Sequence, residues 1–175
     1  MPRSKRDKTT LLSDLADHVL AHGLNTASLR PMAAAAGTSD RMLIYYFETK
    51  DGLISELLDH LAAQMAHRLD HAIPPRRYAS EAQLLTDIVA LMRSDSFAPY
   101  TRVWLDIISS AAQGSEAHRA AGHGIINLYL EWLAKRHPKG AEGAALALTV
   151  IEGTLIMDAL GQRDVTDAAC SDIRA

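Results

Sequence analysis

The residues from Ser28 to Phe47 contain the spacing with the clearest chemical meaning. Ala33, Gly37 and Leu43 stand where a helix-turn-helix needs a small residue, a turn glycine and an apolar anchor. A small residue lets the second helix cross the first closely, and glycine permits the positive φ of a tight turn. The spacing therefore predicts a helix-turn-helix, which presents its second helix to a partner. Two short helices of an ordinary bundle are the alternative.

The residues after Phe47 predict a site for a phosphate group. Thr49 is placed to cap the next helix, and Lys50 then occupies the first helical position. A lysine there opposes the helix dipole, so helix stability alone does not explain it. Free amides at a helix N-terminus bind phosphate well when a lysine lies beside them. A solvated surface lysine is the alternative interpretation.

The composition of the chain indicates that helices position the residues of the helix-turn-helix and of the phosphate site. The chain has 175 residues, 48% hydrophobic and 22% charged, which is typical of one folded domain. Alanine and leucine supply much of the apolar content, which favours helix over strand, so we expect an all-α fold. Gly23, Gly37 and the pair Pro74 and Pro75 are expected to end helices. Helices are predicted at about residues 5–22, 28–36, 39–46, 50–71, 81–93, 99–112, 116–136 and 141–160, with a short one after 166.

Charge and cysteine content narrow the classes of function. The net charge is −3, divided into +1 for residues 1–53 and −4 for the remainder, so binding to a polyanion would need a local patch near the start. The single cysteine, Cys170, excludes an internal disulfide and a thiolate metal site. The uncharged runs, such as Ala120 to Leu130, are too short for a membrane helix, and no signal peptide is visible. We expect a cytoplasmic protein.

The helix predicted at 141–160 is apolar nearly all round. Between Gly143 and Leu160 only Glu152 and Asp158 are charged. Such a helix must be buried on every side. In so small a chain a second copy buries it more easily than the chain's own core, so we expect a homodimer.

Over about residues 8–60 the chain resembles the TetR/AcrR-type bacterial transcriptional regulators. The likeness rests on Gly23 after the first helix, on Ser-Leu-Arg from residue 28, Met-Ala-Ala-Ala-Ala-Gly-Thr-Ser from residue 32, Met-Leu-Ile-Tyr-Tyr-Phe from residue 42 and Thr-Lys-Asp-Gly-Leu from residue 49. Beyond residue 60 it is one of architecture only. The resemblance implies a helix-turn-helix DNA-binding domain at residues 1–48. It also implies an effector-binding and dimerisation domain at residues 49–175, with the fourth helix as connector.

Three positions depart from the family pattern. The family often has glycine where this chain has Arg41, tyrosine where it has Ile44 and threonine where it has Ala27. Ile44 lacks the hydroxyl that the usual tyrosine offers to phosphate, and Tyr45 and Tyr46 are candidates to replace it. Arg41 adds a fork of donors able to reach a guanine edge in the major groove.

With this resemblance, DNA contacts are expected on and around the second helix of the motif. Asp40 either orients Arg41, accepts from a cytosine amine or favours the helix dipole. Ser28 is expected to cap the first helix of the motif, and Pro31 to fall in its first turn, while Leu43 and Phe47 belong to the core. Arg3, Lys5 and Arg6 either form a basic N-terminal arm on phosphates or in the minor groove, or belong to a solvated tail. The expected DNA contacts are Ser28, Arg30, Ser39, Asp40, Arg41, Met42, Tyr45, Tyr46 and Lys50.

The sequence after the helix-turn-helix supports fewer predictions about binding sites. Candidate ligand-pocket residues, which at helical spacing are core residues first, are Met65, Tyr100, Trp104, Tyr129, Glu152 and Met157. Glu152 either meets a cationic or hydroxylated effector or crosses the dimer interface to an arginine. His60, His67 and His71 share a flank of the fourth helix but are expected to be exposed, so we expect no metal and no cofactor.

We therefore expect a homodimeric regulator that binds a palindromic DNA operator, a repressor released by a small molecule. An enzyme is not expected, because no spacing suggests a nucleophile with its base or a pair of acids. A helical protein-interaction adaptor that has lost DNA binding is the alternative, since residues 1–53 carry a net charge of only +1 and Ile44 replaces a phosphate contact.

Overall fold

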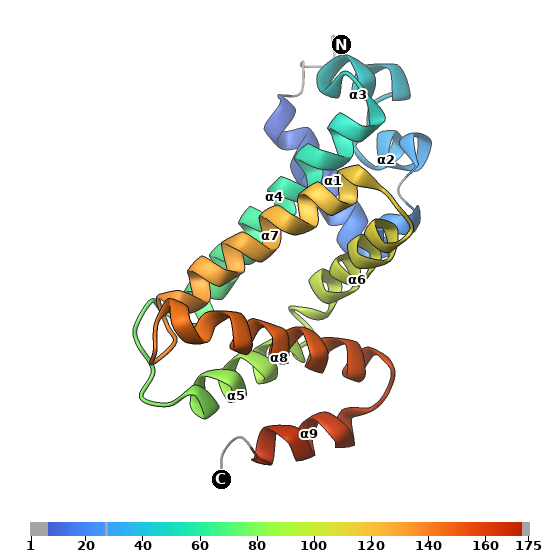
Figure 1. Cartoon of the computed structure of the whole chain (residues 1–175). Helices are drawn as coiled ribbons and strands as arrows, with labels where there is room; N and C mark the ends of the chain where they lie inside the picture. The colour runs from blue at the N-terminus through green and yellow to red at the C-terminus, as the bar shows by residue number, and fades with distance from the viewer. Residues whose placement is uncertain (1–6, 27, 173–175) are drawn as a thin grey trace. The chain divides into compact units, whose positions relative to one another are not determined.

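A computed structural model describes residues 7–26 and 28–172, so the predicted arm at Arg3, Lys5 and Arg6 and the departure at Ala27 lie outside the described residues. The described residues form an all-helical structure (Figure 1), as predicted. No helix among them is long and apolar enough to cross a membrane. The elements are α1 (Lys8–His22), the short 3-10 helix η1 (Leu24–Thr26), α2 (Leu29–Ala35), α3 (Asp40–Phe47), α4 (Lys50–Ala72), α5 (Glu81–Met92), α6 (Ala98–Ala112), α7 (Glu116–Ala134), α8 (Ala141–Ala159) and α9 (Arg163–Asp172).

Glycines end the first two helices, as predicted. Gly23 follows α1 with a φ of 85° and donates its N–H to the Val19 carbonyl at 2.8 Å. Gly37 follows α2 with a φ of 58°, and both values lie where glycine is favoured. The start of α1 was predicted too early, at residue 5. Asp7 is the N-cap, since its carboxylate accepts the Thr10 N–H at 2.7 Å.

The later helix boundaries follow from breakers and loop contacts. α4 ends at Ala72, just before Pro74 and Pro75. α7 ends at Ala134, two residues before the predicted end, because Arg136 and His137 form the turn into α8. α9 begins at residue 163, earlier than predicted, since the break after α8 lies at a glycine with a φ of 78°.

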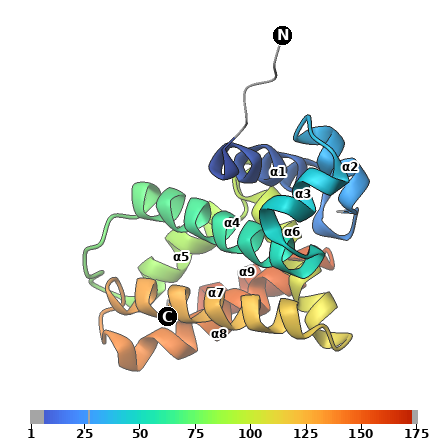
Figure 2. The same ribbon diagram turned by 90° about the horizontal axis from the view of Figure 1, so that it is seen from above.

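The chain divides into two compact units, Met1–His67 with Arg102–Gly122, and Arg68–Thr101 with His123–Ala175. Within the first unit, α1, α2 and α3 lie together (Figures 1 and 2) and form the head of this unit. The predicted domain boundary between residues 48 and 49 remains a prediction. The buried side chains of the head include Leu11, Leu15, Val19, Met32, Leu43 and Phe47.

In the second unit, α8 packs against α5, and α9 packs against both (Figure 1). An arginine at the end of α5 joins the three helices. Arg93 donates to both oxygens of Asp158 at 2.6 and 3.0 Å, to Thr166 at 2.7 Å and to Asp167 at 2.7 Å. These four hydrogen bonds, which we call the Arg93 clamp, hold α9 against α8 because Thr166 and Asp167 lie on α9 while Asp158 lies on α8.

A fully buried arginine fixes the turn after α7 within the same unit. Arg136 donates to the Ile73 carbonyl at 2.8 Å, to the Trp132 carbonyl at 3.0 Å and to the Asp70 carboxylate at 2.6 Å. Its guanidinium also lies 3.9 Å from the centre of the Trp132 ring. Burial lowers the pKa of Arg136 from its ordinary value, and the Asp70 carboxylate opposes that shift. The sequence did not predict this anchor.

Candidate nucleic-acid interface

The helix pair α2 and α3 has the packing that the sequence spacing predicts. Ala33 and Leu43 are buried, and Gly37 takes up its positive φ in the turn between the helices. The Thr38 N–H donates to the Ala33 carbonyl at 2.8 Å, which closes the turn. The helix-turn-helix is therefore present, and α3 is its second helix.

α3 divides into a buried face and an exposed face. Leu43 and Phe47 point into the core of the head. Arg41 and Tyr45, one helical turn apart, are exposed, and Tyr45 has a relative exposure of 66%. Tyrosine and arginine are both enriched at contact surfaces, because each combines apolar area with hydrogen-bond donors. This face is therefore a candidate contact surface.

The flanks of α3 carry the other predicted residues of that helix. Ser39 is its N-cap and accepts the Met42 N–H at 3.3 Å, so its hydroxyl is engaged in capping. Asp40 is exposed in the first turn, where the helix dipole favours a carboxylate. Tyr46 is half-buried, and its ring lies edge-on to Tyr45 with centroids 5.5 Å apart. Met42 is half-buried.

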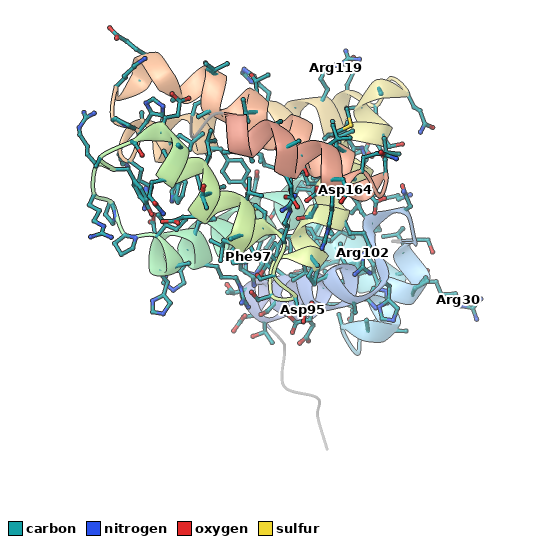
Figure 3. The ribbon with its side chains drawn as sticks, turned by 90° about the horizontal axis from the view of Figure 1, so that it is seen from below. Arg30, Asp95, Phe97, Arg102, Arg119 and Asp164 are labelled. Atoms are coloured by element: carbon teal, nitrogen blue, oxygen red, sulfur yellow. The ribbon has the colours of Figure 1, made fainter. Side chains whose placement is uncertain are left out.

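α2 supplies an exposed cation and an exposed hydroxyl. Ser28 stands at the N-cap position, as predicted, but its side chain makes no capping hydrogen bond. Its hydroxyl is therefore available to a partner. Arg30 is exposed in the first turn and its side chain points away from the ribbon (Figure 3). Pro31 falls in that same turn, where its missing N–H costs little.

The N-terminus of α4 lies directly after α3 and has the predicted cap. The Thr49 hydroxyl accepts the Gly52 N–H at 2.9 Å, and Lys50 is the first, exposed residue of the helix. The turn requires a positive φ of 65° at Glu48. A side chain at Gly52 would place its Cβ 2.5 Å from the Phe47 carbonyl oxygen, so glycine allows α4 to start this close to the end of α3. Sequence reasoning assigned no role to Gly52.

Charges near the candidate interface are balanced. The exposed cations Arg30, Arg41 and Lys50 lie on α2, α3 and the start of α4, and the exposed acids Asp40, Glu48 and Asp51 lie on α3 and around the start of α4. Lys8 is engaged elsewhere, since its ammonium lies 2.6 Å from the Glu56 carboxylate and 4.9 Å from the centre of the Phe47 ring. The surface is therefore not a general polyanion-binding patch.

The predicted ligand-pocket residues divide between the two units. In the first unit Met65 is buried and Trp104 is half-buried. In the second unit, burial, with the charge of Glu152 as the next cause, raises the pKa of the Tyr129 phenol. Tyr100 is buried in that unit as well, with Arg68 5.6 Å from the centre of its ring.

Met157 lies apart from the aromatic residues of its unit. It has a relative exposure of 42% and lies beside the exposed Ile156 on the outer face of α8. That position suits an interface better than a pocket within one chain. Of the three histidines expected to be exposed, His67 and His71 are so, whereas His60 is half-buried because it packs beside Gln64, whose side chain lies 3.0 Å from its ring. Among residues 7–26 and 28–172, no three metal-ligating side chains lie together.

No protein-family model and no curated protein matches this chain. Solved structures do match nearly its whole length. A transcriptional regulator from Rhodococcus sp. Rha1 is 21% identical, over 94% of this chain and 92% of that one, with a TM-score of 0.69. The multidrug binding protein EbrR, in complex with imidazole, is 18% identical, over 97% and 96%, with a TM-score of 0.64.

A TetR transcription regulator from Haloarcula marismortui ATCC 43049 is 16% identical, over 94% of each chain, with a TM-score of 0.62. Likeness at these identities shows the fold. This chain therefore has the fold of the TetR/AcrR-type regulators, as its sequence predicts.

Proposed function

We propose that this chain, whose fold is that of the TetR/AcrR-type regulators, is a sequence-specific DNA-binding regulator of transcription that works in the cytoplasm. The observation that carries the proposal is the outer face of α3, where Arg41 and Tyr45 are exposed while Leu43 and Phe47 hold the helix in the head. An α-helix fits the major groove of B-DNA, in which every base pair presents a distinct pattern of donors and acceptors.

The exposed side chains take different parts in this proposal. The Arg41 guanidinium donates to a guanine edge, and Tyr45 contacts the groove wall or a thymine methyl group. Lys50 and the free amides at the start of α4 bind one phosphate, while Arg30 and the unengaged hydroxyl of Ser28 bind others. Phosphate contacts set the register of the protein on DNA, and α3 then reads the sequence.

The outer face of α8 supports assembly into a homodimer. It carries an apolar row in which Leu146 has a relative exposure of 62%, followed by Ile156, Met157 and Leu160. Gly153 lies within the same row with open space around it, which permits close approach of a second helix. Dimeric helix-turn-helix proteins place their two recognition helices in successive major grooves, about 34–36 Å apart, and we propose that a dimer of this chain binds a palindromic operator in that way.

The second unit supports the proposal of a small-molecule effector. The buried Tyr100 and the half-buried Tyr129 and Glu152 supply aromatic surface and a carboxylate in that unit. Such a site suits an aromatic or cationic effector. EbrR, which shares the fold, was solved with imidazole and with proflavin. We propose that an effector shifts the dimer to a spacing of heads that does not fit the operator, which makes the protein a repressor; a coupling of about 1–3 kcal/mol is typical.

Selection of bound duplexes from a random DNA pool tests the proposal. The purified full chain should enrich a palindrome, and Arg41→Ala should weaken binding to it by about 1–3 kcal/mol while relaxing the preference at one position of each half-site. Arg119→Ala is the matched control, because Arg119 is an exposed arginine on α7 that pairs with Glu116 at 2.6 Å. A pool that yields no preferred sequence would refute the proposal and favour the protein-interaction adaptor.

A further inference from the structure

The α1–α2 connection is held by one carboxylate that comes from α6, about eighty residues later in the chain. Asp106 accepts the Leu24 N–H at 2.8 Å through one oxygen and the Asn25 side-chain N–H at 2.6 Å through the other. Leu24 and Asn25 belong to η1, which leads into α2. Both oxygens of the carboxylate are therefore committed to the head of the first unit.

A second contact lies one helical turn earlier on α6. Arg102 donates to the Ala21 carbonyl at 3.4 Å, near the end of α1. The two side chains suit the groups that they face, because a cation is favoured at the carbonyl end of α1 and an anion at the amides that follow it. α6 thus carries a pair of charges matched to the end of α1 and the start of η1.

Gly23 allows the carboxylate to approach this closely. Its φ of 85° disfavours any other residue, and a Cβ added there would lie 3.3 Å from the Asp106 oxygen. The glycine that ends α1 therefore serves two purposes, the turn of the backbone and the seat of the Asp106 side chain. The sequence predicted the first of these and not the second.

We propose that Asp106 is a positioning residue for DNA binding, which holds η1 and the start of α2 in the position that DNA contact requires. The inference rests on the proposed function. α2 starts at Leu29, three residues after η1, and carries the exposed Arg30. Loss of the Asp106 contacts releases η1 and lets α2 shift relative to α3, so the phosphate contacts of α2 and the base contacts of α3 no longer fit one DNA site.

An exchange of donor and acceptor tests this role. Asp106→Ala removes the acceptor of both Leu24 and Asn25. Asp106→Asn alone keeps both hydrogen bonds, because the Asn25 amide can turn its oxygen toward the new donor. Asn25→Asp alone places two carboxylates face to face. The double variant of Asp106→Asn with Asn25→Asp restores both hydrogen bonds with the donor and the acceptor interchanged, so its behaviour separates this contact from a general loss of folding. Asp59→Asn, an exposed carboxylate on α4, is the control.

The measured quantity is the dissociation constant for the selected operator, at a temperature where circular dichroism shows every variant folded. Asp106→Ala and Asn25→Asp should each bind at least about fivefold more weakly, whereas the double variant and the control should stay within about twofold of the wild type. Hydrogen exchange of the Leu24 amide should rise in Asp106→Ala and Asn25→Asp and fall again in the double variant. The salt slope should fall with the lost phosphate contacts.

Two outcomes overturn the inference. One is faster exchange at Leu24 with unchanged operator affinity, which would make the contact structural only. The other is a double variant as weak as the sum of its single variants. A wild-type protein that selects no duplex refutes the proposed function instead, whereas a wild type that binds DNA alongside equally active variants refutes only the role of Asp106.

Discussion

Replacing Arg93 by alanine removes the Arg93 clamp and tests how firmly α9 is held. The guanidinium and the Asp158 carboxylate have relative exposures of 22% and 10%, so solvent screens their attraction only in part. Asp167 is 62% exposed and adds little, since exposed pairs contribute about 0–1 kcal/mol. The energy of the clamp therefore lies mainly in the two hydrogen bonds to Asp158 and the one to Thr166.

The expected loss of stability depends on how well the remaining Asp158 carboxylate is solvated and hydrogen-bonded after Arg93 is removed. Breaking a fully buried ion pair costs about 3–5 kcal/mol, because the remaining charge stays without its partner. Asp158 retains the hydroxyl of Thr166 at 2.8 Å and some contact with water, which reduces the loss. We expect Arg93→Ala to lower the free energy of unfolding by about 2–3 kcal/mol. Because α9 packs on α8, the same substitution should weaken the proposed dimer.

The pH dependence gives this prediction a second, independent readout. Hydrogen bonding to Arg93 holds the pKa of Asp158 below its ordinary value of 3.8. The stabilisation is therefore fully present above the unfolded-state pKa, and it is lost as the pH falls below 3.8 through the folded-state pKa. The difference between wild type and variant should stay constant from neutral pH down to about 5 and shrink below 3.8.

Urea titrations at neutral and acidic pH measure both quantities. Arg119→Ala is again the control, because Arg119 and Glu116 are 58% and 80% exposed and their pair should contribute less than about 0.5 kcal/mol. A loss in Arg93→Ala no larger than in the control would refute the reasoning. So would a difference between Arg93→Ala and wild type that does not change with pH.

Three other substitutions give further predictions. Lys50→Ala should weaken binding to all DNA sequences alike and flatten the salt slope by about 0.9 per head, as anisotropy at several salt concentrations would measure. Leu146→Glu should yield a folded monomer by analytical ultracentrifugation, because a charge on the outer face of α8 costs little in water and much in a dry interface. Gly52→Ala should destabilise the protein by about 1–3 kcal/mol in thermal unfolding, despite the better helix propensity of alanine, because the new Cβ would meet the Phe47 carbonyl.

Short-range rules predicted much of the fold and of the helix-turn-helix. Helical spacing located the helices, and Gly23, Gly37 and Thr49 marked ends and caps because each acts on backbone groups within four residues. The buried face of α3 could be predicted for the same reason, since Leu43 and Phe47 are one turn apart. The errors lie at the ends of α1, α7 and α9.

Contacts between distant residues could not be predicted from spacing. Asp106 binds residues 81 and 82 positions away, and Arg136 reaches Asp70 across 66 positions. Each of these side chains looks like an ordinary surface charge in the sequence, because its partner is determined by the packing of helices. The exposure of Met157 depends in the same way on which face of α8 meets α5, which an all-round apolar helix does not reveal.

The balance of charge near α3 bears on how such a surface would select DNA. A strongly cationic head binds any phosphate backbone, and its specificity then competes with that background. Here Arg30, Arg41 and Lys50 are offset by Asp40, Glu48 and Asp51, the exposed acids on α3 and around the start of α4. Even if all six such cations of a dimer contacted phosphate, they would contribute no more than about 5.4 to the salt slope. Affinity must then come from the correct placement of two heads and from contacts with bases. Both contributions are lost when α2 shifts relative to α3, because the two helices then no longer fit the same DNA site. The described residues near α3 thus give little general attraction to DNA, and binding through them is sensitive to the small displacements that Asp106 is placed to prevent.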